Sequence, residues 1–128
     1  MSENRLLDYL DHMRQAATDA CAFVEGLERD DFLEDKRTQQ AVIMSLIILG
    51  EAATRVMDSY PGFTQTHANV PWRNMRGMRN RIAHGYYEIN LEVVWDTVQT
   101  ALPALLDQLR VVRLDAGDED HNAHGGRP

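Results

Sequence analysis

The residues best suited to chemistry lie in residues 79–87, which read Arg-Asn-Arg-Ile-Ala-His-Gly-Tyr-Tyr. Histidine titrates near neutral pH and can act as a general base or a general acid. Arginine stays protonated and binds phosphate oxygens through its planar fork. Cleavage of an RNA phosphodiester without a metal ion needs a base for the 2′-hydroxyl, an acid for the departing 5′-oxygen and a cation for the charge on phosphorus. Arg79 and His84 could together supply these groups.

Ordinary structural roles are the alternative for both residues. A histidine before a glycine at a helix end commonly interacts with the helix dipole, and an isolated arginine is commonly a solvated surface residue. On an ideal helix Arg79 and His84 are separated by about 140° and do not share a face, whereas Asn80 and His84 do. Arg79 and His84 therefore converge only if the helix end at Gly85 releases the imidazole, or if two copies of the segment line one cleft at a two-fold interface.

The charge of the chain is unevenly distributed. The net charge of −7 argues against a protein that coats nucleic acid by bulk attraction. Residues 71–87 carry +4 and the remainder carries −11, because four arginines fall within nine residues that contain no acid. A local basic site favours binding of one or two phosphates over an extended groove, and no DNA partner is expected. The four arginines are Arg73, Arg76, Arg79 and Arg81.

The composition bounds the class of protein. A chain of 128 residues with 44% hydrophobic and 26% charged residues is typical of one soluble globular domain. No apolar run approaches the roughly 20 residues that span a bilayer, and the N-terminus has no apolar signal core. We therefore expect a cytoplasmic protein with no membrane contact. Cys21 is the only cysteine, so no internal disulfide can form. Because His67, His121 and His124 lack ligand-like neighbours, neither a metal nor a cofactor is expected.

Hydrophobic periodicity predicts an all-α fold. From Leu6 to Leu27 apolar residues recur every three or four positions, which gives one helical stripe. A second helix is predicted from about Asp35, a suitable N-cap, to Ser59. It is apolar nearly all round between residues 41 and 49, which indicates a central, buried helix. Residues 60–70 are predicted to form a loop.

Two further helices follow the loop. Pro71 begins the third helix, where its missing N–H costs nothing, and Gly85 ends it. Asn90 is a suitable N-cap for the fourth helix. Pro103 lies inside that helix and would cost about 3 kcal/mol or more unless the helix bends. We therefore predict a kink between Gln99 and Pro103.

These elements predict an up-and-down bundle of four to five helices in residues 1–114, with a kinked last helix. Residues 115–128 are polar and lack periodicity, which predicts a disordered tail. Apolar residues also flank the two long stripes, so a homodimer is expected. Trp72 and Trp95 are expected to anchor the core rather than to stack on bases.

The block Val70–Trp95, VPWRNMRGMRNRIAHGYYEINLEVVW, closely resembles the signature of the HepT-like toxins of the HEPN superfamily. Residues 48–53, Ile-Leu-Gly-Glu-Ala-Ala, are similar to the second-helix motif of that family. The resemblance implies an all-α HEPN bundle that dimerises around an Arg-x4-His motif and cleaves RNA without a metal ion. It implies Arg79 and His84 as the catalytic pair, with Asn80 as a polar supporting residue.

The resemblance also implies a partner. HepT-like toxins are paired with a small nucleotidyltransferase antitoxin of the MntA type, which transfers AMP from ATP to the tyrosine of an Arg-x4-His-x-Tyr motif. In this chain that residue is Tyr86. An AMP group would place an anion two residues from His84, where it could pair with Arg79 and occupy the site meant for RNA phosphate. Tyr87 is expected to pack.

Several other residues are assigned by their position relative to this motif. Glu51 follows the apolar stretch of the second helix and is expected to pair with an arginine such as Arg79, although a surface position is the alternative. Arg73, Arg76 and Arg81 are expected to contact RNA or the antitoxin.

A function of another class is also consistent with the chain. It is a non-catalytic helical module that binds a nucleotidyltransferase and presents a tyrosine or a substrate to it. The intact set of Arg79, Asn80 and His84 favours catalysis, because a binding module has no need of that set.

Overall fold

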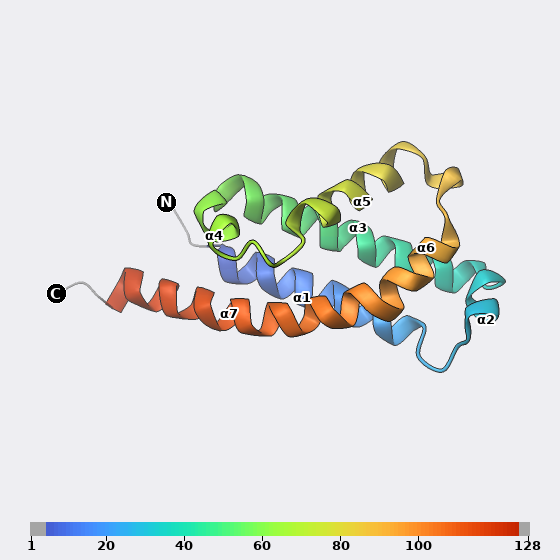
Figure 1. The fold of residues 1–128 in the computed structure, drawn as a ribbon, viewed down its shortest axis with the longest axis horizontal. Coiled ribbons are helices and arrows are strands. Elements are labelled where there is room, and N and C mark those ends of the chain that lie inside the picture. The colour runs from blue at the N-terminus through green and yellow to red at the C-terminus, as the bar shows by residue number, and fades with distance from the viewer. Residues whose placement is uncertain (1–4, 126–128) are drawn as a thin grey trace.

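Two long helices, α1 (Leu6–Phe23) and α3 (Lys36–Ser59), form the centre of the fold. They pack along each other in a computed structural model that describes residues 5–125. The helix α5 (Trp72–His84) lies against α3, and α7 (Leu102–Gly125) lies along α1 (Figure 1). The described residues contain no strand, so the predicted all-α bundle is confirmed.

The core is built from the stripes that the periodicity predicts. Leu10, Met13 and Ala17 of α1 are fully buried, as is Val42 of α3. Trp72 and Trp95 are confirmed as core residues. The buried part of α7 is contributed by Leu102, Leu105, Leu109, Val112 and Ala116.

The helix α3 is central, as its apolar stretch predicts, but one of its apolar faces is exposed. Met44 is 55% exposed and Ile48 is 45% exposed, and the two lie one helical turn apart. By length and composition alone α3 could span a membrane, but half of its most apolar window is buried against the bundle. A core helix of a globular protein has the same properties.

The two predicted N-caps are confirmed. Asp35 accepts a hydrogen bond from the backbone N–H of Thr38 at 3.1 Å. Asn90 accepts from the backbone N–H groups of Glu92 and Val93 at 2.9 and 3.2 Å. Each cap satisfies donors that the first helical turn leaves free, so these residues fix where α3 and α6 (Leu91–Asp96) begin.

Two short helices appear where the sequence predicted none. The helix α2 (Arg29–Leu33) holds Phe32, whose ring is fully buried and lies 5.5 Å from the ring of Trp95. The helix α4 (Pro61–Thr66) corrects the prediction of a loop over residues 60–70, and Phe63 anchors it in the core. Each of these helices is too short to show a hydrophobic periodicity in the sequence. One buried aromatic side chain holds each of them in place.

The predicted interruption of the last helix is confirmed. A π-helical segment, η2 (Thr97–Ala101), separates α6 from α7, and the chain changes direction there (Figure 1). Pro103 cannot donate to the carbonyl of Gln99, and a π turn is one of the ways in which a helix accommodates such a loss.

The last helix extends further than the predicted boundary at residue 114. The backbone of α7 is helical to Gly125, and Ala116 is fully buried in the core. The first part of the segment predicted as a disordered tail therefore continues the helix. Residues 126–128 lie outside the described part of the chain.

Candidate functional site

The candidate site begins where α5 crosses α3 at Gly50. A Cβ atom at this position would lie 2.4 Å from the Cβ of Arg79 and 2.8 Å from the backbone oxygen of Met75. Any larger residue would push the two helices apart. Gly50 therefore sets the depth at which Arg79 lies on α3, a role that the residue spacing alone does not predict.

Arg79 is held by two side chains of α3. Its Nη1 donates to Oε2 of Glu51 at 2.7 Å, and its Nη2 lies 3.4 Å from Oγ1 of Thr54. The side chain of Arg79 is only 20% exposed, whereas that of Glu51 is 50% exposed. The predicted pairing of Glu51 with Arg79 is confirmed. The Nε atom of Arg79 is buried and has no hydrogen-bond partner among the described residues.

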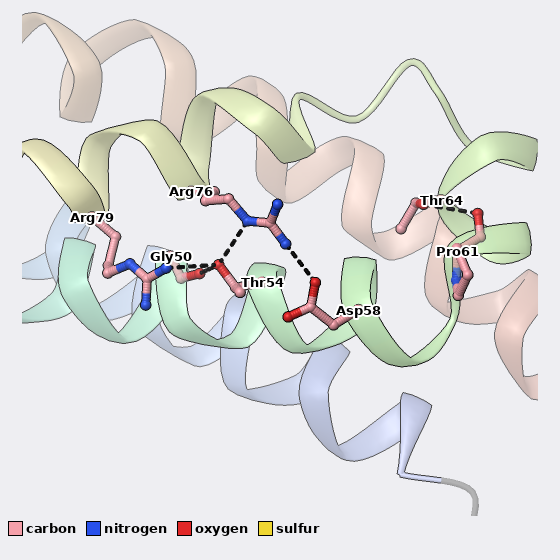
Figure 2. Close-up of polar contacts among 7 residues, drawn as sticks. All are labelled: Gly50, Thr54, Asp58, Pro61, Thr64, Arg76 and Arg79. Atoms are coloured by element: carbon pink, nitrogen blue, oxygen red, sulfur yellow. Dashed lines mark hydrogen bonds and ion pairs between the residues drawn. The ribbon is translucent and has the colours of Figure 1, made fainter.

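A second arginine of α5 shares the Thr54 hydroxyl. Arg76 donates from Nη2 to Asp58 at 2.7 Å, and its Nε lies 3.5 Å from Oγ1 of Thr54. The Thr54 hydroxyl donates its own proton to the carbonyl of Gly50 at 2.8 Å. Its lone pairs therefore remain for the two arginines, and Figure 2 shows both arginine side chains directed toward Thr54. Nothing in the residue spacing alone would have identified Thr54, because its role depends on how α3 and α5 cross.

The basic segment is partly neutralised by these contacts. Of the four arginines that gave residues 71–87 their charge, Arg76 and Arg79 are each paired with an acid of α3. Arg73 and Arg81 form no ion pair within the described part of the chain. The free positive charge at this surface is therefore smaller than the count of arginines suggests, and Arg81 carries part of it.

His84 is the last residue of α5 and is exposed. It lines a cavity of about 410 Å³ between the end of α5 and the start of α6. Arg81, Glu88 and Asn90 line the same cavity, but Arg79 does not. Across residues 5–117, whose side chains the structure describes, no hydrogen bond or ion pair joins Arg79 to His84. The structure therefore does not bring the two predicted catalytic residues into contact within one chain.

Asn80 is exposed, and no hydrogen bond ties its side chain to any other described residue. It shares a helix face with His84 by spacing, but it does not fix the imidazole in this structure. Any support that Asn80 gives to a reaction is therefore directed at a bound molecule or a second chain.

Tyr86 and Tyr87 follow α5 in a short 3₁₀ helix, η1 (Tyr86–Glu88). Their rings meet edge to face with centroids 5.4 Å apart. Tyr86 is 39% exposed and Tyr87 is 97% exposed, so the expectation that Tyr87 packs is wrong. Tyr86 lines a second cavity of about 420 Å³, whose wall includes Lys36 and Gln39 of α3. The tyrosines and His84 thus border different hollows on either side of η1.

Residues 5–117 hold no group of three or more His, Cys, Asp or Glu side chains that could bind a metal ion. His67 lies 4.4 Å from the ring of Phe63 and 3.8 Å from a carboxylate oxygen of Asp115. Trp72 donates from its indole nitrogen to the carbonyl of His67 at 3.0 Å. These contacts give His67 a packing role.

Comparison with known proteins supports a single family. The family described as ribonuclease HepT-like matches residues 13–112. A candidate RNase of Methanocaldococcus jannaschii is 34% identical over 118 residues, which cover 92% of each chain. A candidate ribonuclease HepT of Thermococcus cleftensis is 35% identical over 83% of this chain and 94% of its own length. A candidate RNase of Caldanaerobacter subterraneus is 31% identical over 81% of this chain and 90% of its own length. No solved structure gives a significant match.

Proposed function

The chain belongs to the HepT-like ribonuclease family, and from that premise we propose that it is a metal-independent endoribonuclease that uses Arg79 and His84. The observation that carries the proposal is the fixed guanidinium of Arg79, which Glu51 and Thr54 hold against α3. A preorganised cation is the group that stabilises charge developing on a phosphate. His84 lies exposed at the end of the same helix, where a bound RNA could reach it.

The reaction is an internal transfer at phosphorus. One imidazole takes the proton of the 2′-hydroxyl, and the 2′-oxygen forms a bond to phosphorus. The bond from phosphorus to the 5′-oxygen breaks, and a protonated imidazole gives its proton to that oxygen. The products are a 2′,3′-cyclic phosphate and a free 5′-hydroxyl. Arg79 binds the non-bridging oxygens as their charge increases.

A homodimer supplies the second imidazole. Within one chain Arg79 faces α3 and His84 lines a separate cavity. A second copy of the chain therefore supplies the groups that complete the site. Met44 and Ile48 expose an apolar strip on the face of α3 that also carries Glu51, since the three lie three and four residues apart. This apolar strip beside the candidate site is suited to an interface between two copies.

We further propose that the chain is the toxin of a toxin–antitoxin pair and that a nucleotidyltransferase antitoxin neutralises it by adenylylating Tyr86. Tyr86 is 39% exposed and lies two residues beyond His84 in the chain, although the two residues border different cavities. A phosphodiester added there introduces a negative charge close to the basic groups that would otherwise bind RNA.

Purified chain and its variants test the ribonuclease activity. Wild-type chain should cleave RNA in the presence of EDTA and leave cyclic phosphate ends, and a substrate made wholly of 2′-deoxynucleotides should survive. His84→Ala and Arg79→Ala should each reduce cleavage by at least about 100-fold, the scale of one general acid–base group or one fixed oxyanion donor. Cleavage that persists in His84→Ala would contradict the proposal.

The control mechanism has a separate test. Intact mass is measured after incubation of the chain with its nucleotidyltransferase and ATP. Wild-type chain and Tyr87→Phe should gain AMP and lose RNase activity, whereas Tyr86→Phe should gain none. AMP that persists in Tyr86→Phe would reassign the modification. A chain that binds the nucleotidyltransferase but never cleaves RNA would instead be the non-catalytic presenting module, a reading that the strong exposure of Tyr87 also favours.

A further inference from the structure

A second, smaller cavity adjoins the cavity beside His84. The cavity of about 410 Å³ at the end of α5 shares Met78 and Arg81 with a smaller one of about 160 Å³ that continues between α5 and η2. The larger volume falls within the range of roughly 300–1,000 Å³ that small-molecule sites occupy. Part of its wall is aliphatic, with Ile82, Ile89 and Val94 among the lining residues, and the rest is polar. A flat, apolar-faced group of the size of a nucleobase fits such a space.

Glu88 is a hydrogen-bond acceptor at this cavity that is not otherwise engaged. Its Oε1 lies 3.3 Å from the position of a Cβ built on Gly85, so the carboxylate covers the backbone just after His84. Its backbone N–H donates to the carbonyl of Gly85 at 2.9 Å, but no hydrogen bond or ion pair joins its carboxylate to another residue in the part of the chain whose side chains are described. A free carboxylate presents two oxygens side by side, which suits a ligand with two adjacent donors.

Asn90 supplies donors to the same cavity. Its Oδ1 is occupied, because it accepts from the backbone N–H groups of Glu92 and Val93. Its Nδ2 is left with two donors that no described residue accepts. The cap thus fixes the side chain and leaves the amino group available.

Arg81 provides a cation where the two cavities join. It lines both and has no acidic partner among the described residues. Its Nη1 lies 3.6 Å from the Cβ position of Gly77, so the side chain runs back along α5. A phosphate bound there would lie close to the base-sized cavity and to His84.

We infer that this cavity is the base subsite of the proposed ribonuclease and that it takes a guanine next to the cleaved phosphate. The inference rests on the proposed function. Guanine carries adjacent N1–H and N2–H donors, which a carboxylate such as Glu88 accepts as a pair, and an O6 acceptor, which the Asn90 amide can serve. Arg81 binds the phosphate attached to that nucleotide. Single-stranded RNA is commonly read in this way, with an unstacked base bound along its pairing edge.

Chimeric oligonucleotides test the inference. Each is DNA with one ribonucleotide, so it can be cut only after that nucleotide, and the bases at the ribonucleotide and its 3′ neighbour are varied in turn. Guanine at one of the two positions should raise kcat/KM by at least about tenfold over the other bases, and inosine, which lacks the N2 amino group, should lose most of that gain. Equal rates for all bases in the wild type would overturn the inference.

Two matched pairs of variants locate the preference. Glu88→Gln should reduce the guanine preference below about threefold, whereas Glu92→Gln, on the exposed face of α6 and paired with Arg29, should leave it unchanged. Val93→Phe fills the cavity from its rim and should lower cleavage of the preferred substrate. Its control is Val111→Phe on α7, which should leave cleavage unchanged. The two valines are similarly exposed, at 49% for Val93 and 52% for Val111. A guanine preference that survives both Glu88→Gln and Val93→Phe would contradict this subsite.

A binding measurement separates failure of the subsite from failure of the proposed function. The chain carrying His84→Ala is titrated with short 2′-O-methyl RNAs that cannot be cleaved and that differ in one guanine. Tighter binding of the guanine-containing RNA, lost in Glu88→Gln, supports the subsite even if no RNA is cut. Equal binding of both RNAs rejects the subsite even if the wild type proves to be a ribonuclease.

Discussion

At the scale of single residues, the surroundings of Arg79 explain why a guanidinium can stay in place with most of its surface covered. A charge removed from water is costly unless it is paired and hydrogen-bonded. Glu51 balances the charge and Thr54 accepts from a second nitrogen, while the exposed side of Glu51 keeps the pair in contact with water. The cation is therefore oriented without being sealed in the core.

Glu51→Gln tests whether this orientation matters for the proposed reaction. Glutamine keeps the size of the side chain and an acceptor oxygen but removes the negative charge, so Arg79 is held less firmly. We expect kcat for RNA cleavage to fall by about tenfold while KM does not rise, because a less restrained cation still binds phosphate. Asp58→Asn, which weakens the neighbouring pair at Arg76, is the control and should change kcat little. An unchanged kcat in Glu51→Gln would count against a positioning role.

Gly50→Ala tests the close crossing of α3 and α5. The added methyl group would meet the Cβ of Arg79 at 2.4 Å and the backbone oxygen of Met75 at 2.8 Å. Neither atom can yield without moving a helix, so unfolding free energy should fall by about 1–3 kcal/mol or more. Chemical denaturation measures the change. Gly62→Ala is the control, since its added methyl would meet nothing within 4 Å, and a Gly50→Ala chain as stable as wild type would contradict the crossing geometry.

At the scale of elements, the long helices could be predicted and the short ones could not. The apolar stripes and the capping residues Asp35 and Asn90 identified α1, α3 and the run from α6 to α7, because a period of 3.6 is visible over several turns. The pairing of Glu51 with Arg79 was also predicted. The roles of Gly50 and Thr54 could not be, since they exist only where α3 and α5 cross.

The packing of α7 on α1 includes an ion pair that makes stability depend on pH. Arg113 donates from Nε to Asp11 at 2.7 Å. This hydrogen bond, with the charge of Arg113, holds the pKa of Asp11 below its usual 3.8. A carboxyl whose pKa is lowered by folding stabilises the fold in full above its unfolded pKa, and loses that contribution as the pH falls through the folded value.

Asp11→Asn should therefore destabilise the chain near neutral pH and have little effect in strong acid. Both partners are roughly two-fifths exposed, so water screens the pair and the expected loss at pH 7 is only about 0.2–1 kcal/mol. The difference from wild type should close as the pH falls well below 3.8. Urea unfolding at a series of pH values measures it, with Asp8→Asn on the exposed side of α1 as the control. A difference that stays constant with pH would show that the loss is not electrostatic.

At the scale of the whole molecule, the chain is an acidic body in which Arg81 is an unpaired cation near the end of α5, within its described part. The net charge is −7, and two of the four arginines in residues 71–87 are paired with acids of α3. Long-range attraction of RNA is therefore weak, and recognition depends on local contacts. A site of this kind gains most from a second copy that adds groups to the same cleft.

Ile48→Glu tests the proposed dimer directly. Ile48 is 45% exposed on the apolar strip of α3 that also holds Met44, so a glutamate there should not disturb the core but would place a charge in an apolar interface. Light scattering should find the wild type at twice the chain mass of 14.6 kDa and the variant at that mass. RNA cleavage should be lost together with the dimer if each site needs two imidazoles. Leu114→Glu, at a 64% exposed position on α7, controls for the added charge and should remain dimeric and active. A monomeric Ile48→Glu chain that cleaves RNA at the wild-type rate would show that one chain holds a complete site. In that case Arg79 and His84 would have to meet around the end of α5 when RNA binds.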